Sequence, residues 1–345
     1  MSVRHVITGG SGFVGTRLAQ ALTKRGEDVV IFDIVPPSCK DATFLSGDVR
    51  SERDIAALAL GPDDVVYHLA ARQFHGAVPR RNRTEWFEEV NTQGTRNILD
   101  AMQRGDASRL IFFSTDMTYG LPDQSPVPHS HPQRPIGPYG RSKYAAEQVI
   151  REGMAQRALA ATIFRPRLIA GAGRLGILTK LFALIERGLP VPMIGSGRNR
   201  YQMIAVDDCV SAALHAVEQG VPCGAFNLGS TAPPTVRALL QGVIDQAGSR
   251  SLLVPTPARL VQGVLSGMDK VGLTLLYPEQ FAIADADYVL DTSRTASVMQ
   301  WAPSQSDGDI LFAAYRHFLE TRTQRGGAGP MIGLRDIPSN NGVMP

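Results

Sequence analysis

Tyr139 and Lys143 are the two residues whose types and spacing most directly predict chemistry. They lie four positions apart in a predicted helix over residues 138–157, which places them on one face of that helix. A lysine ammonium beside a phenol favours the phenolate, so Tyr139 could act as a base at ordinary pH. The preceding apolar strand, 109–114, ends in the hydroxyls of Ser114 and Thr115. A hydroxyl there could hydrogen-bond the same substrate oxygen as Tyr139.

A glycine-rich turn near the start of the chain predicts a nucleotide site. It follows the apolar strand 4–8 and precedes a helix that we expect to begin near Thr16. Gly9 suits the tight turn, Gly12 lets a pyrophosphate approach the backbone, and Gly15 lets the helix pack closely on the strand. The free amides at the start of the helix suit a diphosphate.

Asp33 indicates which dinucleotide would bind. It ends the next predicted strand, 28–33, about 20 residues after the glycines, as the dinucleotide-binding pattern expects. A carboxylate at this point accepts hydrogen bonds from both hydroxyls of the adenosine ribose and repels the extra phosphate of NADP. The alternative for an isolated Asp33 is a strand-end cap, but the glycine turn favours the binding role. The sequence therefore predicts NAD.

The elements that must position these residues alternate along the first half of the chain. Helical patterns at 16–25, 51–59, 84–104 and 138–157 separate apolar strands at 4–8, 28–33, 43–46, 64–69, 109–114 and 159–165. This alternation is typical of an α/β fold with a Rossmann-type, doubly wound parallel sheet.

After Pro166 the rhythm changes, and we expect a smaller, mixed α/β substrate lobe with helical stretches at 174–187 and 235–247. Residues 225–229 return to the sheet. The predicted division is an NAD-binding domain (1–166 and 204–230), a substrate lobe (167–203 and 231–325) and a tail (326–345).

Composition narrows the class of protein. The chain has 345 residues, 43% of them hydrophobic and 19% charged, which is typical of a soluble globular protein with a sizeable core. A net charge of +3 does not argue for nucleic acid. Three scattered cysteines without a CxxC pair predict reduced thiols, a cytoplasmic location and no structural metal. We expect no signal peptide, since the first strand starts so early, and no apolar run approaches the ~20 residues of a membrane span.

Taken in order, these motifs resemble the extended short-chain dehydrogenase/reductases, in particular the NAD-dependent epimerase/dehydratase group that acts on nucleotide sugars. The resemblance runs from about residue 3 to about residue 320. It implies that Thr115 takes the catalytic hydroxyl position, that Tyr139 is the base and that the chain forms a homodimer through helices near 84–104 and 138–157. The implied cofactor contacts are Gly9, Gly12, Phe13, Val14, Gly15, Asp33, Asp48, Val49, Leu69, Ala70, Ala71, Asn91, Tyr139 and Lys143.

Departures from the family pattern concern the substrate side. Met117 stands where 4,6-dehydratases carry a proton-removing glutamate, which disfavours dehydration. Many relatives carry an asparagine two residues after the Arg-Pro pair, where it holds the substrate diphosphate. This chain has Arg167 and then Leu168 at that point. Arg167 could substitute as a phosphate ligand or face solvent, and Arg200 is a second candidate for the phosphates.

Two further residues have open roles. His75 could line the substrate cleft, although an ordinary loop histidine is the alternative. Asp116 could act as a general acid, as in the dehydratases, or could serve by hydrogen bonding.

The resemblance thus implies a nucleotide-sugar epimerase that acts at C4 through transient oxidation to a keto sugar. An NAD-dependent dehydrogenase or ketoreductase is the alternative, with a nucleotide sugar or an apolar, hydroxysteroid-like alcohol as substrate; Leu168 and Met117 favour the apolar substrate. A catalytically silent NAD sensor or scaffold is a third reading, against which the intact Thr115, Tyr139 and Lys143 argue.

Overall fold

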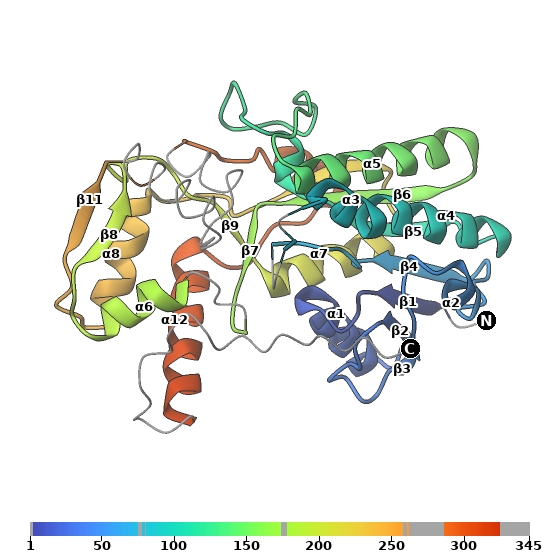
Figure 1. Cartoon of the computed structure of the whole chain (residues 1–345), viewed down its shortest axis with the longest axis horizontal. Helices are drawn as coiled ribbons and strands as arrows, with labels where there is room; N and C mark the ends of the chain where they lie inside the picture. Colours follow the sequence, from blue (N-terminus) through green and yellow to red (C-terminus); the bar gives the residue numbers. More distant parts are fainter. Residues whose placement is uncertain are drawn as a thin grey trace.

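The computed structural model describes residues 3–74, 78–79, 81–173, 178–257, 261 and 286–324. Its centre is a seven-stranded sheet in the order β10-β6-β5-β4-β1-β2-β3, with every neighbouring pair parallel (Figure 1). The strands are β1 (Arg4–Thr8), β2 (Asp28–Asp33), β3 (Thr43–Ser46), β4 (Asp64–His68), β5 (Arg109–Phe113), β6 (Ala160–Pro166) and β10 (Gly224–Leu228). The predicted parallel sheet, including the return of residues 225–229, is confirmed.

Helices cover both faces of the sheet, because the strands are apolar on both sides. On one face α1 (Phe13–Lys24) and α7 (Val206–Glu218) pack against the sheet around Leu18 and Val210. On the other face α2 (Glu52–Ala56), α4 (Gly94–Arg104) and α5 (Pro138–Gln156) pack around Ile98 and Ile150. The two buried clusters confirm the doubly wound arrangement.

Two helices differ from the prediction. Helix α1 begins at Phe13 rather than near Thr16, because Gly12 already caps it: the Thr16 amide donates to the Gly12 carbonyl at 2.9 Å. The segment expected as one helix over 84–104 is α3 (Arg83–Glu88), a π-helical turn η1 (Glu89–Gln93) and α4. Such wide turns are often found at functional sites.

A second group of elements has its own core. It contains α6 (Leu178–Glu186), α8 (Val236–Gln246) and α12 (Asp307–Gln324), packed around Phe182, Leu240 and Phe318. Two small parallel sheets join it: β8 (Val191–Ile194) with β11 (Leu253–Thr256), and β7 (Leu168–Ala170) with β9 (Met203–Ala205). Figure 1 shows most of this group beside the central sheet. The exact division of the chain into domains stays a prediction.

Several elements of this second half were not predicted. Helix α11 (Ser293–Met299) and the three-residue strands β7 and β9 are too short for a clear pattern, and the long helix α12 mixes polar and apolar residues without a clear one.

Candidate active site

The predicted site residues gather where the parallel strands end. Gly9 follows β1, Asp33 ends β2, Leu69 follows β4, Thr115 follows β5 and Arg167 follows β6. Ligands of open α/β sheets bind at this carboxyl edge. The strand order therefore brings together residues that are far apart in the sequence.

The glycine turn has the geometry that a diphosphate requires. Gly9 has a φ of +73°, and its missing Cβ would lie 2.5 Å from the Ala70 nitrogen. At Gly15, a Cβ would lie 2.4 Å from the Gly9 carbonyl oxygen. The turn is thus pressed between α1 and the residues after β4. No side chain caps the start of α1 within the described residues, which leaves amides of its first turn for an anion.

Asp33 lies beside this turn. Its Oδ2 accepts a hydrogen bond from the Ser11 amide at 3.0 Å and its Oδ1 accepts one from the Val35 amide at 3.1 Å. A carboxylate has roughly four acceptor positions, so both oxygens retain capacity for ribose hydroxyls. The residues present at this end of the sheet fit an adenine dinucleotide.

Asp48 and Val49 form the next part of the predicted cofactor site. Val49 is buried, and Gly94 of α4 packs so closely on it that a Cβ there would lie 2.7 Å from Val49 Cγ2. The guanidinium of Arg50 donates to Asp48 at 2.9 and 2.6 Å, and this pairing lowers the pKa of Asp48. Arg50 also reaches Glu89 at 3.4 Å. The sequence reasoning missed Arg50, which holds the Asp48 side chain, a predicted cofactor contact.

Asn91 braces the site through the π-helical turn. Its Oδ1 accepts from the Arg72 amide at 2.8 Å, while its Nδ2 donates to the Arg72 carbonyl at 3.0 Å and to Ser142 Oγ at 2.9 Å. Ser142 Oγ in turn donates to the carbonyl of Tyr139 at 2.8 Å. The wide turn therefore connects the segment after Ala71 to the first turns of α5, where the predicted base lies.

Tyr139 and Lys143 occupy the buried face of α5, one turn apart. Tyr139 is 6% exposed, and its ring packs edge-on against Phe74, with ring centres 5.2 Å apart. Lys143 is 2% exposed, with Nζ 4.0 Å from the centre of the Phe112 ring. Burial lowers the pKa of Lys143 to about 7, and the charge of Glu147 opposes this shift.

The Lys143 ammonium has no hydrogen-bond acceptor among the described residues. It makes no hydrogen bond and no ion pair with any residue that the structure describes. Buried polar groups are almost always hydrogen-bonded, so such a group indicates a ligand. The hydroxyls of a ribose would satisfy it.

Thr115 lies at the carboxyl end of β5 and caps the short 3-10 turn Asp116–Thr118. Its Oγ1 accepts from the Met117 amide at 3.2 Å and donates to Asp116 Oδ1 at 3.1 Å. A Cβ on Gly140 would lie 2.7 Å from the Met117 carbonyl oxygen, so this turn packs directly on the start of α5. Thr115 and the helix that carries Tyr139 are therefore held together.

Asp116 and Arg167 form a buried ion pair that the sequence did not predict. Arg167 Nη1 donates to Asp116 Oδ2 at 2.7 Å. The guanidinium lies 4.5 Å from the centre of the Tyr288 ring, and the Tyr288 hydroxyl donates to the Asp116 carbonyl at 2.8 Å. Arg167 thus contacts the catalytic turn rather than facing solvent.

The remaining substrate candidates have different placements. Arg200 is partly exposed and pairs with Asp287 through Nη2 at 2.6 Å. Met117 lies half-buried in the 3-10 turn after β5. His75 lies outside the described residues. Of the two described candidates, Met117 lies on the turn that Thr115 caps, and Arg200 pairs with Asp287.

His68 is a further residue near the site that the sequence reasoning missed. Its ring nitrogens lie 2.6 Å from Thr8 Oγ1 and 2.9 Å from Thr95 Oγ1, which ties β1, β4 and α4 together. Burial, reinforced by the charge of Lys143, lowers the pKa of His68 to about 3. A neutral His68 adds no second positive charge beside Lys143. In the sequence, His68 could have been noticed as a polar residue at the end of the otherwise apolar strand β4.

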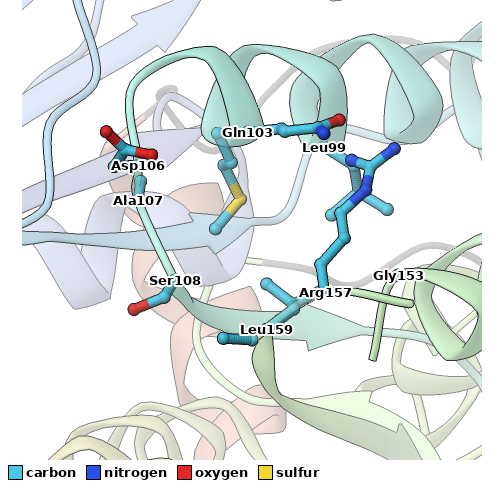
Figure 2. A pocket seen from close by; sticks show the side chains of 10 residues that line it. Leu99, Gln103, Asp106, Ala107, Ser108, Gly153, Arg157 and Leu159 are labelled. Atoms are coloured by element: carbon cyan, nitrogen blue, oxygen red, sulfur yellow. The ribbon is translucent and has the colours of Figure 1, made fainter. Parts of the chain in front are cut away.

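A pocket of about 190 Å³ lies elsewhere in the molecule. Figure 2 shows the side chains that line it, among them Leu99 and Gln103 of α4 and the residues Ser108 and Leu159. Ser108 and Leu159 precede β5 and β6, so this pocket lies at the amino ends of the strands, away from Thr115. It is not part of the candidate active site.

None of the helices in the described residues is both long and apolar enough to cross a membrane. Nor do those residues contain a group of three or more His, Cys, Asp or Glu side chains that could hold a metal ion. Asp208 near the start of α7 has a structural role: its carboxylate accepts from Ser304 and Gln305.

Sequence comparison places the chain among known proteins. The model of the NAD dependent epimerase/dehydratase family matches residues 5–229. The uncharacterized protein y4nG of Sinorhizobium fredii is 32% identical over 329 residues, 94% of this chain and 81% of that protein. The UDP-glucose 4-epimerase of Streptomyces lividans is 34% identical over 182 residues, 50% of this chain and 54% of that enzyme. The alignment thus spans about half the length of the Streptomyces enzyme.

Solved structures share the fold over nearly the whole chain. A UDP-glucose 4-epimerase from Thermotoga maritima, solved with UDP-glucose, has a TM-score of 0.73 and 24% identity, covering 92% of this chain and 99% of that one. MoeE5, solved with UDP-glucuronic acid and NAD, has a TM-score of 0.74 and 22% identity over the same shares. At these identities the likeness concerns the fold alone.

Proposed function

Because the chain belongs to the NAD-dependent epimerase/dehydratase family, we propose that it is a nucleotide-sugar epimerase that inverts the configuration at C4. It is an enzyme of the extended short-chain dehydrogenase/reductase type, and its cofactor is NAD. The reaction at C4 and the nucleotide-sugar substrate are what we propose beyond the family.

The observation that carries the proposal is the arrangement of Tyr139, Lys143 and Thr115. The first two lie one turn apart on the buried face of α5, and Thr115 lies on the turn that packs against the start of that helix. A base, a cation that activates it and a hydroxyl donor are the groups that oxidation and reduction of an alcohol require.

In the proposed reaction, Tyr139 removes the proton from the C4 hydroxyl of the sugar. The Lys143 ammonium favours the phenolate form of Tyr139. Thr115, whose hydroxyl donates to Asp116 Oδ1 in this structure, turns that proton to the same oxygen as it becomes a ketone. NAD, when bound, takes up the hydride and returns it. The keto sugar turns within the site, and Tyr139 gives the proton back once the opposite face has been reduced.

The residues on the cofactor side fit this role. The glycine turn leaves the backbone open to a diphosphate, Asp33 keeps acceptor capacity for ribose hydroxyls, and buried Lys143 lacks an acceptor among the described residues. An epimerase must hold its cofactor through the whole cycle, since loss of the reduced form would strand the keto sugar.

The names of relatives support the reaction. Besides the Streptomyces enzyme, a UDP-glucose 4-epimerase of Streptococcus mutans is 29% identical over 343 residues, 90% of this chain and 94% of that enzyme. We propose a uridine-diphosphate sugar as the substrate class on this ground.

A net dehydrogenase or ketoreductase is the second candidate. The observation that favours it is Leu168, which is 41% exposed just after β6, where an apolar substrate would gain a contact. The half-buried Met117 adds to an apolar lining near Thr115. This enzyme would release its cofactor after each turnover.

The test combines cofactor content with a single variant. The purified protein is denatured and the released small molecules are identified by mass spectrometry; the epimerase predicts NAD or NADH in near-stoichiometric amount. Protein that emerges empty but binds added NAD would favour the dehydrogenase. The Tyr139→Phe variant should keep NAD and lose turnover, and undiminished activity in this variant would refute the proposed mechanism.

We also propose a homodimer through the helices of 84–104 and 138–157, and a cytoplasmic location. Light scattering tests the first, with substitutions on the exposed faces of α4 and α5. Cell fractionation tests the second.

A further inference from the structure

Arg167 carries a buried donor that has no acceptor among the described residues. Its side chain is 9% exposed, and no described residue accepts a hydrogen bond from its Nε. The rest of the side chain is firmly held: Nη1 binds Asp116, and the guanidinium lies against the rings of Tyr288 and Tyr201, 4.5 and 5.7 Å from their centres. An unsatisfied buried group in an otherwise fixed side chain calls for a ligand atom.

The charge of Arg167 is already balanced. The carboxylate of Asp116 lies 2.7 Å from Nη1 and is itself 4% exposed. Both Asp116 oxygens are engaged, one by Arg167 and the other by the hydroxyl of Thr115 at 3.1 Å. The pair therefore carries no net charge, and the Arg167 Nε beside it is a buried donor without an acceptor among the described residues.

The geometry points to Arg167 and Asp116 as a pair that determines substrate specificity. The pair accepts a sugar whose substituent next to the reacting carbon is uncharged and bears a hydroxyl. It rejects the corresponding uronic acid. This inference rests on the proposed function, because it takes Thr115 to contact the reacting oxygen.

Distance supports the assignment. Thr115 Oγ1 lies 3.1 Å from Asp116, and a hydrogen bond to the reacting oxygen adds about 2.8 Å. The Asp116 carboxylate therefore lies within about 6 Å of that oxygen. A substituent on the neighbouring ring carbon falls in the same range. A hydroxyl there could accept from Arg167 Nε, whereas a carboxylate would approach the buried carboxylate of Asp116, whose Arg167 partner is already engaged.

The test compares UDP-glucose with UDP-glucuronic acid, which differ only in that substituent. For the intact enzyme we expect kcat/KM to be at least about 100-fold higher for UDP-glucose, a ratio within the range of charge-based discrimination. In Asp116→Asn the positive charge of Arg167 is no longer balanced. The ratio should then fall at least about tenfold, because the uronic acid gains a partner.

Asp287→Asn is the matched control. It breaks the Arg200–Asp287 ion pair, which has a similar distance of 2.6 Å but is exposed. Since both substrates carry the same nucleotide, the ratio of their kcat/KM values should not change. Binding of both sugars to Asp116→Asn in a Tyr139→Phe background gives the same comparison if the single variant turns over too slowly.

The outcomes separate this inference from the proposed function. Equal or preferred use of UDP-glucuronic acid by the intact enzyme would overturn the inference and leave the epimerase standing. A ratio unchanged by Asp116→Asn would also overturn it. Conversion of neither sugar, nor of UDP-N-acetylglucosamine, by NAD-loaded protein would overturn the proposed function, and the inference with it.

Discussion

Ser114 Oγ donates a hydrogen bond of 2.6 Å to Oε1 of the buried Glu147. Glu147 also receives both Nε and Nη2 of Arg165, at 3.0 and 2.6 Å. The two hydroxyls that follow β5 therefore have different surroundings. Ser114 belongs to a buried charged network, whereas the Thr115 hydroxyl bonds within its own turn, to Asp116 Oδ1 and the Met117 amide.

This relationship predicts opposite outcomes for two adjacent substitutions. Thr115→Val should lower kcat by about 10²–10³-fold, because it removes a donor to the developing oxyanion. Thr115→Ser keeps that donor and should retain most of the activity. Ser114→Ala should instead lower the free energy of unfolding by roughly 1–3 kcal/mol, since Glu147 loses a buried partner. Steady-state kinetics and denaturant unfolding measure the two effects; the reverse pattern would show that Ser114 is the catalytic hydroxyl.

Lys143 predicts a pH dependence of stability in the cofactor-free protein. Its pKa is about 7 in the folded state against 10.5 ordinarily, because burial disfavours the ammonium. Between pH 7 and 10.5 the unfolded chain binds the proton that the folded protein has released, so stability rises with pH. Relative to Lys143→Met, which cannot titrate, the intact protein should gain up to a few kcal/mol of unfolding free energy over this window. Parallel pH profiles for the two proteins would contradict the assigned pKa.

Asp33 predicts cofactor preference, with Asp28 as a control on the same strand. Asp33→Asn removes the charge at the carboxyl end of β2 and should weaken NAD binding by about 10–100-fold. The difference in affinity between NAD and NADP should become smaller, because the repulsion of the extra phosphate is lost. Asp28→Asn lies at the exposed amino end of β2, away from the glycine turn, and should change neither affinity. Fluorescence titration with each dinucleotide gives the four dissociation constants. Equal effects of the two substitutions would argue against a ribose contact by Asp33.

Gly15 and Gly242 form a second matched pair. Gly15→Ala would place a methyl group 2.4 Å from the Gly9 carbonyl oxygen, so the turn must shift, and both NAD affinity and stability should fall. Gly242 lies within α8, where an added Cβ meets nothing within 4 Å. Gly242→Ala should therefore stabilise the protein by roughly 0.5–1 kcal/mol. Thermal unfolding with and without NAD separates the two results.

Local spacing made much of the fold and part of the site predictable. The glycine turn, Asp33 and the Tyr139–Lys143 pair each depend on residues within a strand–turn–helix unit or one helical turn, so their arrangement follows from secondary structure alone. The start of α1 was misplaced because Gly12 caps the helix without a side-chain signal.

The contacts that refine the site join distant parts of the chain. Ser114 and Glu147 are 33 residues apart, Asp116 and Arg167 are 51 apart, and Tyr288 reaches Asp116 across 172 residues. Their meeting depends on strand order and on which side chains remain buried, neither of which a single sequence specifies. For this reason Arg167 was predicted as a phosphate ligand or a surface residue, whereas the structure pairs it with Asp116.

In the proposed reaction, hydride leaves C4 of a nucleotide sugar and returns to the same carbon while the sugar stays bound. The most direct test uses UDP-glucose deuterated at C4, incubated with the enzyme in ordinary water and followed by NMR and mass spectrometry. We predict UDP-galactose that keeps the deuterium at C4, with no accumulation of free NADH. Loss of deuterium to solvent, or release of a keto sugar together with NADH, would contradict the account.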